Sequence, residues 1–272
     1  MKFVVFSDIH YASEVPSHDE KAMERKLVGY AVPLVDQLID VIDNKIKPDV
    51  AICLGDFIED LMNHDKDIQN FLYIWKLVNR MKTPLYSTIG NHELRSMENE
   101  DEIKKLMGYD NLTYSIEIMG YHLVFLGLSI DKKESEAEGG IIKTRYLPEK
   151  DIEWLKNDLG KNELPCIVFC HYGIAEDEMK GNWWFDSKVA RELALLGNRD
   201  ELKDIFKSDG NVLAVFSGHQ HWTKILKEDG IDYYVVGSLT ENIDNDGVPD
   251  GVYFEVEVEG KELRVEEKHL RL

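Results

Sequence analysis

Five short apolar runs, each followed at once by acidic, amide or histidine side chains, constrain this chain more than any other feature of its sequence. The runs are rich in Val, Ile and Phe, and segments with helical spacing lie between them. This alternation predicts a layered α/β or α+β sheet architecture. The polar stretches that follow the runs are DIH (8–10), GDFIED (55–60), GNHE (90–93), HYG (171–173) and GHQH (218–221).

Strands are expected wherever an apolar, β-branched or aromatic run is bounded by turn residues. Several of these runs are apolar on both faces, which favours buried central positions in a sheet. The charged segment at about 250–272 predicts a hairpin at a sheet edge. The expected strands are 2–7, 49–54, 84–89, 112–118, 121–129, 166–170, 212–217, 223–227, 231–237 and 252–258.

Helices are expected where apolar residues recur at intervals of three and four. The longest such pattern runs from Met23 to Ile42, and Pro148 suits the first turn of another helix. The expected helices are 19–46, 65–81, 100–107, 148–159 and 198–207.

Composition limits the kinds of partner. A chain of 272 residues with 43% hydrophobic content is long enough for one large core, and we expect a single domain over 1–272. A net charge of −20 disfavours nucleic-acid binding, which needs a basic surface. No stretch has the length of a membrane span or of a signal peptide. The cysteines lie in apolar runs, so we expect buried free thiols and a cytoplasmic protein.

The polar side chains after the strands suit a metal centre. Because ligands bind at the carboxyl ends of strands in open α/β sheets, these residues are expected to converge. His219 and His221 lie two residues apart, so on extended chain both point the same way. The histidines, carboxylates and amide form a mixed nitrogen and oxygen set, suited to Mn, Fe, Zn or Co. The set exceeds what one catalytic zinc needs, which favours two metals sharing a carboxylate.

These motifs resemble the signature of the calcineurin-like metallophosphoesterases. Each motif alone is weak, but five in the usual order, over residues 3 to about 240, form a specific pattern. Glu59 departs mildly from it, since many members have Asp there, at a supporting position. The matching motifs are Asp8-x-His10, Gly55-Asp56-x-x-Glu59, Gly90-Asn91-His92-Glu93, His171 and Gly218-His219-x-His221.

The resemblance implies a four-layer α/β/β/α sandwich with two facing mixed sheets. It implies two divalent ions, with Mn or Fe favoured, and attack on phosphorus by a metal-bridging hydroxide. One ion would be held by Asp8, His10 and His221, the other by Asn91, His171 and His219, with Asp56 bridging them. His92 would be catalytic, either protonating the leaving oxygen or stabilising the transition state, and Asp60 or Glu93 would hold it.

The substrate is predicted less sharply. Tyr11 and Tyr172 each follow a predicted ligand and should line the pocket, and a loop with Trp183, Trp184 and Phe185 either stacks on a base or caps a hydrophobic core. Arg145 and Arg199 are either candidates for binding a second phosphate or ordinary surface arginines, which is the default expectation.

Within the family, the sequence is most similar to the branch with cyclic-nucleotide phosphodiesterases and manganese-dependent ADP-ribose/CDP-alcohol phosphatases. The expected function is hydrolysis of a small nucleotide-like phosphodiester or pyrophosphate. A phosphomonoesterase and a non-catalytic scaffold on the same fold remain alternatives, and the oligomeric state is left open.

Overall fold

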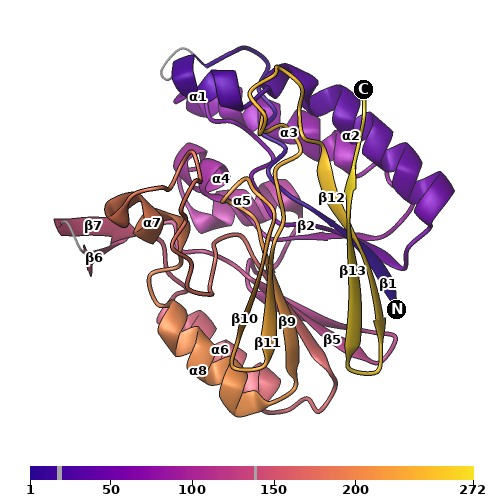
Figure 1. Cartoon of the computed structure of the whole chain (residues 1–272), viewed down its shortest axis with the longest axis vertical. Helices are drawn as coiled ribbons and strands as arrows, with labels where there is room; N and C mark the ends of the chain where they lie inside the picture. Colours follow the sequence, from indigo (N-terminus) through magenta and orange to yellow (C-terminus); the bar gives the residue numbers. More distant parts are fainter. Residues whose placement is uncertain (17–19, 138–139) are drawn as a thin grey trace.

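Two large mixed sheets form the centre of the protein, in a computed structural model that describes residues 1–16, 20–137 and 140–272 (Figure 1). The first sheet has the order β13-β12-β1-β2-β3, in which β1, β2 and β3 are parallel, β12 pairs with β1 in antiparallel fashion, and β12 and β13 form an antiparallel hairpin. The predicted C-terminal edge hairpin is therefore confirmed. The strands are β1 (Lys2–Phe6), β2 (Val50–Cys53), β3 (Leu85–Ser87), β12 (Val252–Glu259) and β13 (Glu262–His269).

The second sheet has the order β10-β11-β9-β8-β5-β4. Its four central strands are parallel, and an antiparallel strand lies at each edge. The strands are β4 (Tyr114–Ile118), β5 (Tyr121–Leu126), β8 (Cys166–Cys170), β9 (Val212–Ser217), β10 (Lys224–Glu228) and β11 (Ile231–Val235).

The two sheets face each other across a core rich in aromatic rings. Phe3 of β1 packs edge-on against Phe169 and Phe216 of the second sheet, with ring centroids 6.0 and 5.8 Å apart. Stacked rings also run across that sheet from strand to strand, with Phe125 5.0 Å from Phe169 and Phe169 5.7 Å from Phe216. This buried row of aromatic rings packs the two sheets against each other.

Helices cover the outer face of each sheet and complete the predicted four layers (Figure 1). The apolar residues of α2 (Ala31–Asp40) and α3 (His64–Val78) pack over the first sheet. Those of α6 (Glu149–Leu159) and α8 (Arg199–Asp209) pack over the second. The shorter helices are α1 (Glu20–Arg25), α4 (Asn91–Ser96), α5 (Glu100–Met107) and α7 (Lys188–Ala194).

The long helix expected over 19–46 is wrong as a single element, and its residue 19 lies outside the described residues. The chain instead forms α1, a 3-10 turn at Val28–Tyr30, α2 and a π-helical turn at Val41–Ile46. Pro33 explains the break, because it has no N–H to donate and is tolerated only in a first helical turn, where α2 places it. Pro148, expected in the first turn of a helix, is the N-cap residue that precedes α6.

A small hairpin, β6 (Lys133–Ala137) and β7 (Gly140–Thr144), was not predicted from the sequence and projects from the sandwich (Figure 1). Its first strand reads KESEA, which lacks the apolar alternation of a half-buried strand.

The three cysteines are free and buried, as expected. None of the helices in the described ranges has the length and apolarity that a membrane span requires.

Candidate metal centre

The polar motifs converge because the strands before them are parallel. Asp8 follows β1, Asp56 follows β2 and Asn91 follows β3, so all three lie at the carboxyl edge of the first sheet. His171 and His219 follow β8 and β9 at the matching edge of the second sheet. The loops are joined by backbone hydrogen bonds, from Asp8 N to Gly55 O at 3.1 Å and from Gly218 N to His171 O at 3.0 Å.

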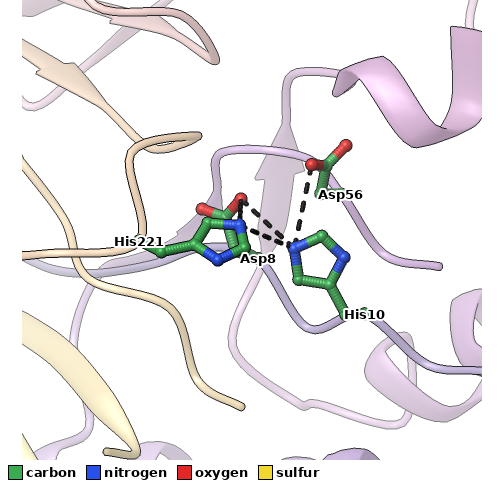
Figure 2. Close-up of side chains that lie close together, drawn as sticks. All are labelled: Asp8, His10, Asp56 and His221. Atoms are coloured by element: carbon green, nitrogen blue, oxygen red, sulfur yellow. Dashed lines mark hydrogen bonds and ion pairs between the residues drawn. The ribbon is translucent and has the colours of Figure 1, made fainter. Parts of the chain in front are cut away.

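One group of potential metal ligands consists of Asp8, His10, Asp56 and His221 (Figure 2). One ligand atom from each lies within 4.8 Å of the others, and all four side chains are buried. The Nε2 atoms of His10 and His221 are 2.9 Å apart. Asp8 Oδ1 lies 3.4 Å from Nε2 of His221 and 3.7 Å from Nε2 of His10.

A second group consists of Asp56, His171 and His219, whose ligand atoms again lie within 4.8 Å of one another. Asn91 adjoins it, with Oδ1 3.2 Å from Nε2 of His171. Asp56 Oδ2 lies 3.2 Å from His171 Nε2 and 3.9 Å from His10 Nε2. A single carboxylate oxygen thus faces both groups.

The carboxylate oxygens in this cluster fit bound cations. Asp8 Oδ1 and Asp56 Oδ2 are buried and accept no hydrogen bond. The other oxygen of each carboxylate is occupied, since Asp8 Oδ2 accepts from His219 N at 3.0 Å and Asp56 Oδ1 accepts from His92 N at 2.9 Å. A buried carboxylate oxygen that accepts no hydrogen bond is costly unless a positive charge lies beside it, which a metal ion or a protonated histidine ring can supply. The cluster is therefore able to bind metal ions.

Five of these residues have a left-handed backbone. Their φ angles lie between +48° and +67°, for Asp8, His10, Asp56, His219 and His221. Such angles are uncommon outside glycine and are tolerated best by Asp, Asn and His. Strain of this kind gathers at functional sites, where the surrounding structure holds it in place.

Two glycines allow the loops to approach closely. A Cβ on Gly218 would lie 2.0 Å from Ser7 Oγ and 2.6 Å from Asp8 Oδ2. A Cβ on Gly90 would lie 2.1 Å from Asp56 Oδ1. Any side chain at either position would therefore displace a carboxylate of the cluster.

The histidines are held from behind by further acceptors. His10 Nδ1 lies 2.9 Å from Glu59 Oε2, and His221 Nδ1 donates to Glu241 Oε2 at 2.8 Å. His171 Nδ1 donates to the Leu54 carbonyl at 2.8 Å. Such partners fix ring orientation and raise the basicity of a ligand. Glu241 was not predicted as a site residue, although it lies in the loop after β11 as the other site residues lie after their strands.

His92 lies beside the cluster between two cations. Lys26 Nζ is 3.1 Å from its Nε2 and Arg95 Nη2 is 2.6 Å from its Nδ1, which also lies 2.7 Å from Asp60 Oδ2. Burial lowers the pKa of His92 to about 4. The Glu59 carboxylate opposes this effect, but Lys26 and Arg95 add to it, so the neutral ring is favoured. Of the two residues expected to hold His92, Asp60 does so.

Glu93 instead binds backbone. Its carboxylate accepts from the amides of Asp56, Phe57 and Ile58 at 3.1, 2.8 and 3.2 Å. The same carboxylate accepts from Gly90 N at 2.8 Å, so Glu93 fixes the loop that carries Asp56.

Two histidines carry raised pKa values in the metal-free protein. Burial opposes a charge on His171, yet the Asp56 carboxylate raises the pKa of His171 to about 9. Burial is likewise outweighed at His221, where Asp8 and Glu241 raise the pKa to about 9. Burial and the charge of His171 hold the pKa of His219 well below its usual value. Two protons therefore occupy ligand nitrogens near neutral pH.

A cavity of about 430 Å³ opens over the cluster. Tyr172, Trp184 and Phe185 line it, and Tyr172 stacks on His219 with ring centroids 3.9 Å apart. Arg145 also lines it, whereas Arg199 lies elsewhere, bound to Glu176 and Glu192.

Two expected lining residues lie outside this cavity. Tyr11 does not line it and instead stacks on the exposed Tyr73 of α3, with ring centroids 4.9 Å apart. Trp183 is 51% exposed and packs edge-on against Trp184, beside Arg25. Trp184 also packs on a small cluster of Ala12, Ala22, Met23 and Val28, so the aromatic loop both borders the cavity and covers apolar residues.

Comparison with known proteins places this fold, with its cluster of potential metal ligands, among metal-dependent phosphoester hydrolases. The sequence model of the calcineurin-like phosphoesterases matches residues 1–223. The chain belongs to this family. No curated protein sequence matches it.

Several solved structures share the fold. A dimetal phosphatase from Danio rerio is 13% identical with a TM-score of 0.70, over 97% of this chain and 98% of that one. A phosphopantetheinyl hydrolase from Mycobacterium tuberculosis is 12% identical with a TM-score of 0.53, over 87% and 89% of the two chains. GAP50 of Plasmodium, described as an anchor in the inner membrane complex, is 13% identical with a TM-score of 0.52, over 98% and 84%.

Proposed function

We propose that the protein is a dinuclear metal-dependent phosphoesterase that hydrolyses a small nucleotide-like phosphodiester or pyrophosphate. The observation that carries the proposal is the position of Asp56 Oδ2, 3.2 Å from His171 and 3.9 Å from His10, where it faces both groups of ligands. In this proposal Asp8, His10 and His221 hold one ion, Asn91, His171 and His219 hold the other, and Asp56 binds both. Two bound ions would activate water and neutralise the phosphoryl oxygens.

His92 is the proposed catalytic histidine of the chain itself. Because its pKa is lowered to about 4, the imidazole is neutral at neutral pH. The neutral ring carries one N–H. With that proton on Nε2, and Nδ1 accepting from Arg95 at 2.6 Å, the ring can donate a hydrogen bond to a phosphoryl or leaving oxygen, whereas delivering a proton would require the charged ring. Stabilisation of the transition state is thus the better supported of its two expected roles.

The same residue types suggest the ion and the substrate. The mixed nitrogen and oxygen ligands suit manganese or iron. A cavity of about 430 Å³ is larger than one phosphoryl group, and the rings of Tyr172, Trp184 and Phe185 offer a base or sugar an apolar surface. Three buried free cysteines are in keeping with a cytoplasmic location.

Replacement of Asp56 by Asn tests the proposal. Hydrolysis of bis-p-nitrophenyl phosphate with manganese should fall by at least about a hundredfold, because the carboxylate shared by both groups is lost. Asp232→Asn is the control, since Asp232 pairs with Lys227 at the amino end of β11, whereas the cluster lies at the carboxyl ends of the parallel strands. Unchanged hydrolysis in the Asp56 variant would overturn the proposal.

Two further measurements separate the alternatives. Faster hydrolysis of p-nitrophenyl phosphate than of the diester would identify a phosphomonoesterase. Fewer than one ion per chain at saturating manganese, without hydrolysis of either ester, would favour a non-catalytic scaffold. The anchor role of GAP50 makes that last measurement worth including.

A further inference from the structure

The cavity over the metal centre has cationic side chains in excess. Five lysines and arginines line it, although the chain carries a net charge of −20. Lys26 and Arg95 are neutralised locally, by Glu59 at 2.8 Å and Asp60 at 2.8 Å. Lys132, Lys143 and Arg145 form no ion pair with any residue in the described part of the chain. The three unpaired cations all come from β7 and the segments next to the β6-β7 hairpin.

Arg145 is the most constrained of the three. Its side chain is 3% exposed, and one end donates to the carbonyls of Ser129, at 3.0 Å, and Ile130. Its Nε is buried and has no acceptor. A buried guanidinium with an unpaired donor is costly unless an anion supplies the missing acceptor.

Arg145 also lies next to the second group of metal ligands. Tyr172 lines the same cavity as Arg145, follows His171 directly and stacks on His219 with ring centroids 3.9 Å apart. A substrate with one phosphoryl group at the metals can therefore place its next group in the part of the same cavity that Arg145 lines. The planar guanidinium fork and two flexible ammonium groups match a phosphate dianion better than a single carboxylate.

We propose that Lys132, Lys143 and Arg145 form a subsite for a second phosphate of the substrate, one that is not the group under attack. This inference rests on the proposed function, because it assumes that the first phosphate lies at the metal centre. It assigns the enzyme to substrates with two phosphate groups in preference to matched substrates with one.

The test compares two ligands that differ by one phosphate. Binding of AMP and of adenosine 5′-(α,β-methylene)diphosphate is measured by titration calorimetry at saturating manganese. The wild-type protein should bind the diphosphate about tenfold or more tightly, as expected for added charge-assisted hydrogen bonds. In Arg145→Gln that ratio should fall to about threefold or less.

Two further variants make the result decisive. Arg199→Gln should keep the wild-type ratio, since Arg199 is bound to Glu176 and Glu192 outside the cavity. The double variant Lys132→Gln, Lys143→Gln changes only exposed side chains, so it tests the subsite even where the buried Arg145 variant fails to fold. An unchanged ratio in both cavity variants, or no preference in the wild type, would overturn the subsite. If the wild-type protein did not hydrolyse bis-p-nitrophenyl phosphate, the phosphoesterase proposal would be overturned instead.

Discussion

Arg25 and Lys26 are neighbours in sequence, yet each binds a different carboxylate behind the same group of metal ligands. Arg25 Nε donates to Glu241 at 2.7 Å, and Lys26 Nζ donates to Glu59 at 2.8 Å. These carboxylates lie behind His221 and His10, respectively. The C-terminal end of α1 is therefore connected to both histidines, whose Nε2 atoms are 2.9 Å apart.

Glu241→Gln should weaken metal binding. The variant keeps the shape of the side chain but removes the charge that supports the His221 ring. Changes to such partners typically cost about 10 to 100-fold in metal affinity, and we expect the lower end here. Manganese titration measures the effect, and Glu266→Gln, which changes a half-buried carboxylate paired with Arg264 and Lys268, is the control. Equal affinity in the two variants would show that Glu241 does not support the site.

His219 and His221 should each bind a different metal ion. If the two groups hold separate metals, His221→Gln loses mainly the ion shared with Asp8 and His10, and His219→Gln mainly the other. Each variant should retain about one of two ions at manganese concentrations that fill the wild type. Metal analysis after gel filtration gives the count, and loss of both ions in both variants would contradict the split.

Metal binding should release protons. Because the pKa values of His171 and His221 are about 9 in the metal-free protein, both rings are protonated at pH 7.5 and must lose a proton to bind an ion. About two protons per chain should appear when manganese is added at that pH. Calorimetry in buffers of different ionisation enthalpy measures the number, which should fall as the pH approaches 10.

The stability of the metal-free protein should follow the same pKa values. A histidine whose folded pKa is raised from 6.5 to about 9 stabilises the fold fully below pH 6.5, and the effect is lost as the pH rises through 9. The midpoint of thermal unfolding should therefore decrease between pH 6.5 and 9 in chelator-treated protein. A flat profile for that protein, measured alongside the manganese-loaded form, would argue against the charged pair.

Gly218→Ala should disturb the site from the backbone. The added Cβ would meet Ser7 Oγ at 2.0 Å and Asp8 Oδ2 at 2.6 Å, so the loop or the carboxylate must shift. We expect a loss of about 1–3 kcal/mol in the free energy of unfolding and weaker metal binding. Gly29→Ala is the matched control, because nothing lies within 4 Å of its added Cβ. Denaturant unfolding and manganese titration of both variants check the prediction.

Much of the fold could be predicted from the sequence because hydrophobic patterning decides it. All ten expected strands are present, and 212–217 coincides with β9. The β6-β7 hairpin and the short helices α4 and α7 lack such a pattern, so local sequence gave no signal for them. The break in the helix expected over 19–46 follows from Pro33, whose effect outweighs the apolar periodicity. The expectation of one domain stays a prediction.

Of the site, the strand-end residues could be predicted because parallel strands bring their carboxyl ends together. Their long-range partners could not. Arg25 and Glu241 are 216 positions apart, and only the folded chain brings them to 2.7 Å. The placement of Tyr11 against Tyr73 likewise depends on α3, which sequence adjacency to His10 does not reveal.

The left-handed backbone at Asp8, His10, Asp56, His219 and His221 restricts which substitutions these positions can accept. Outside glycine, the residues most at ease with that backbone are Asp, Asn and His, and these are also residues that bind divalent ions. The backbone conformation and the requirement for a metal ligand therefore favour the same few residue types. Exchanging Asp, Asn or His for one another at these positions should keep the loop conformation. Such variants therefore report on metal binding separately from folding.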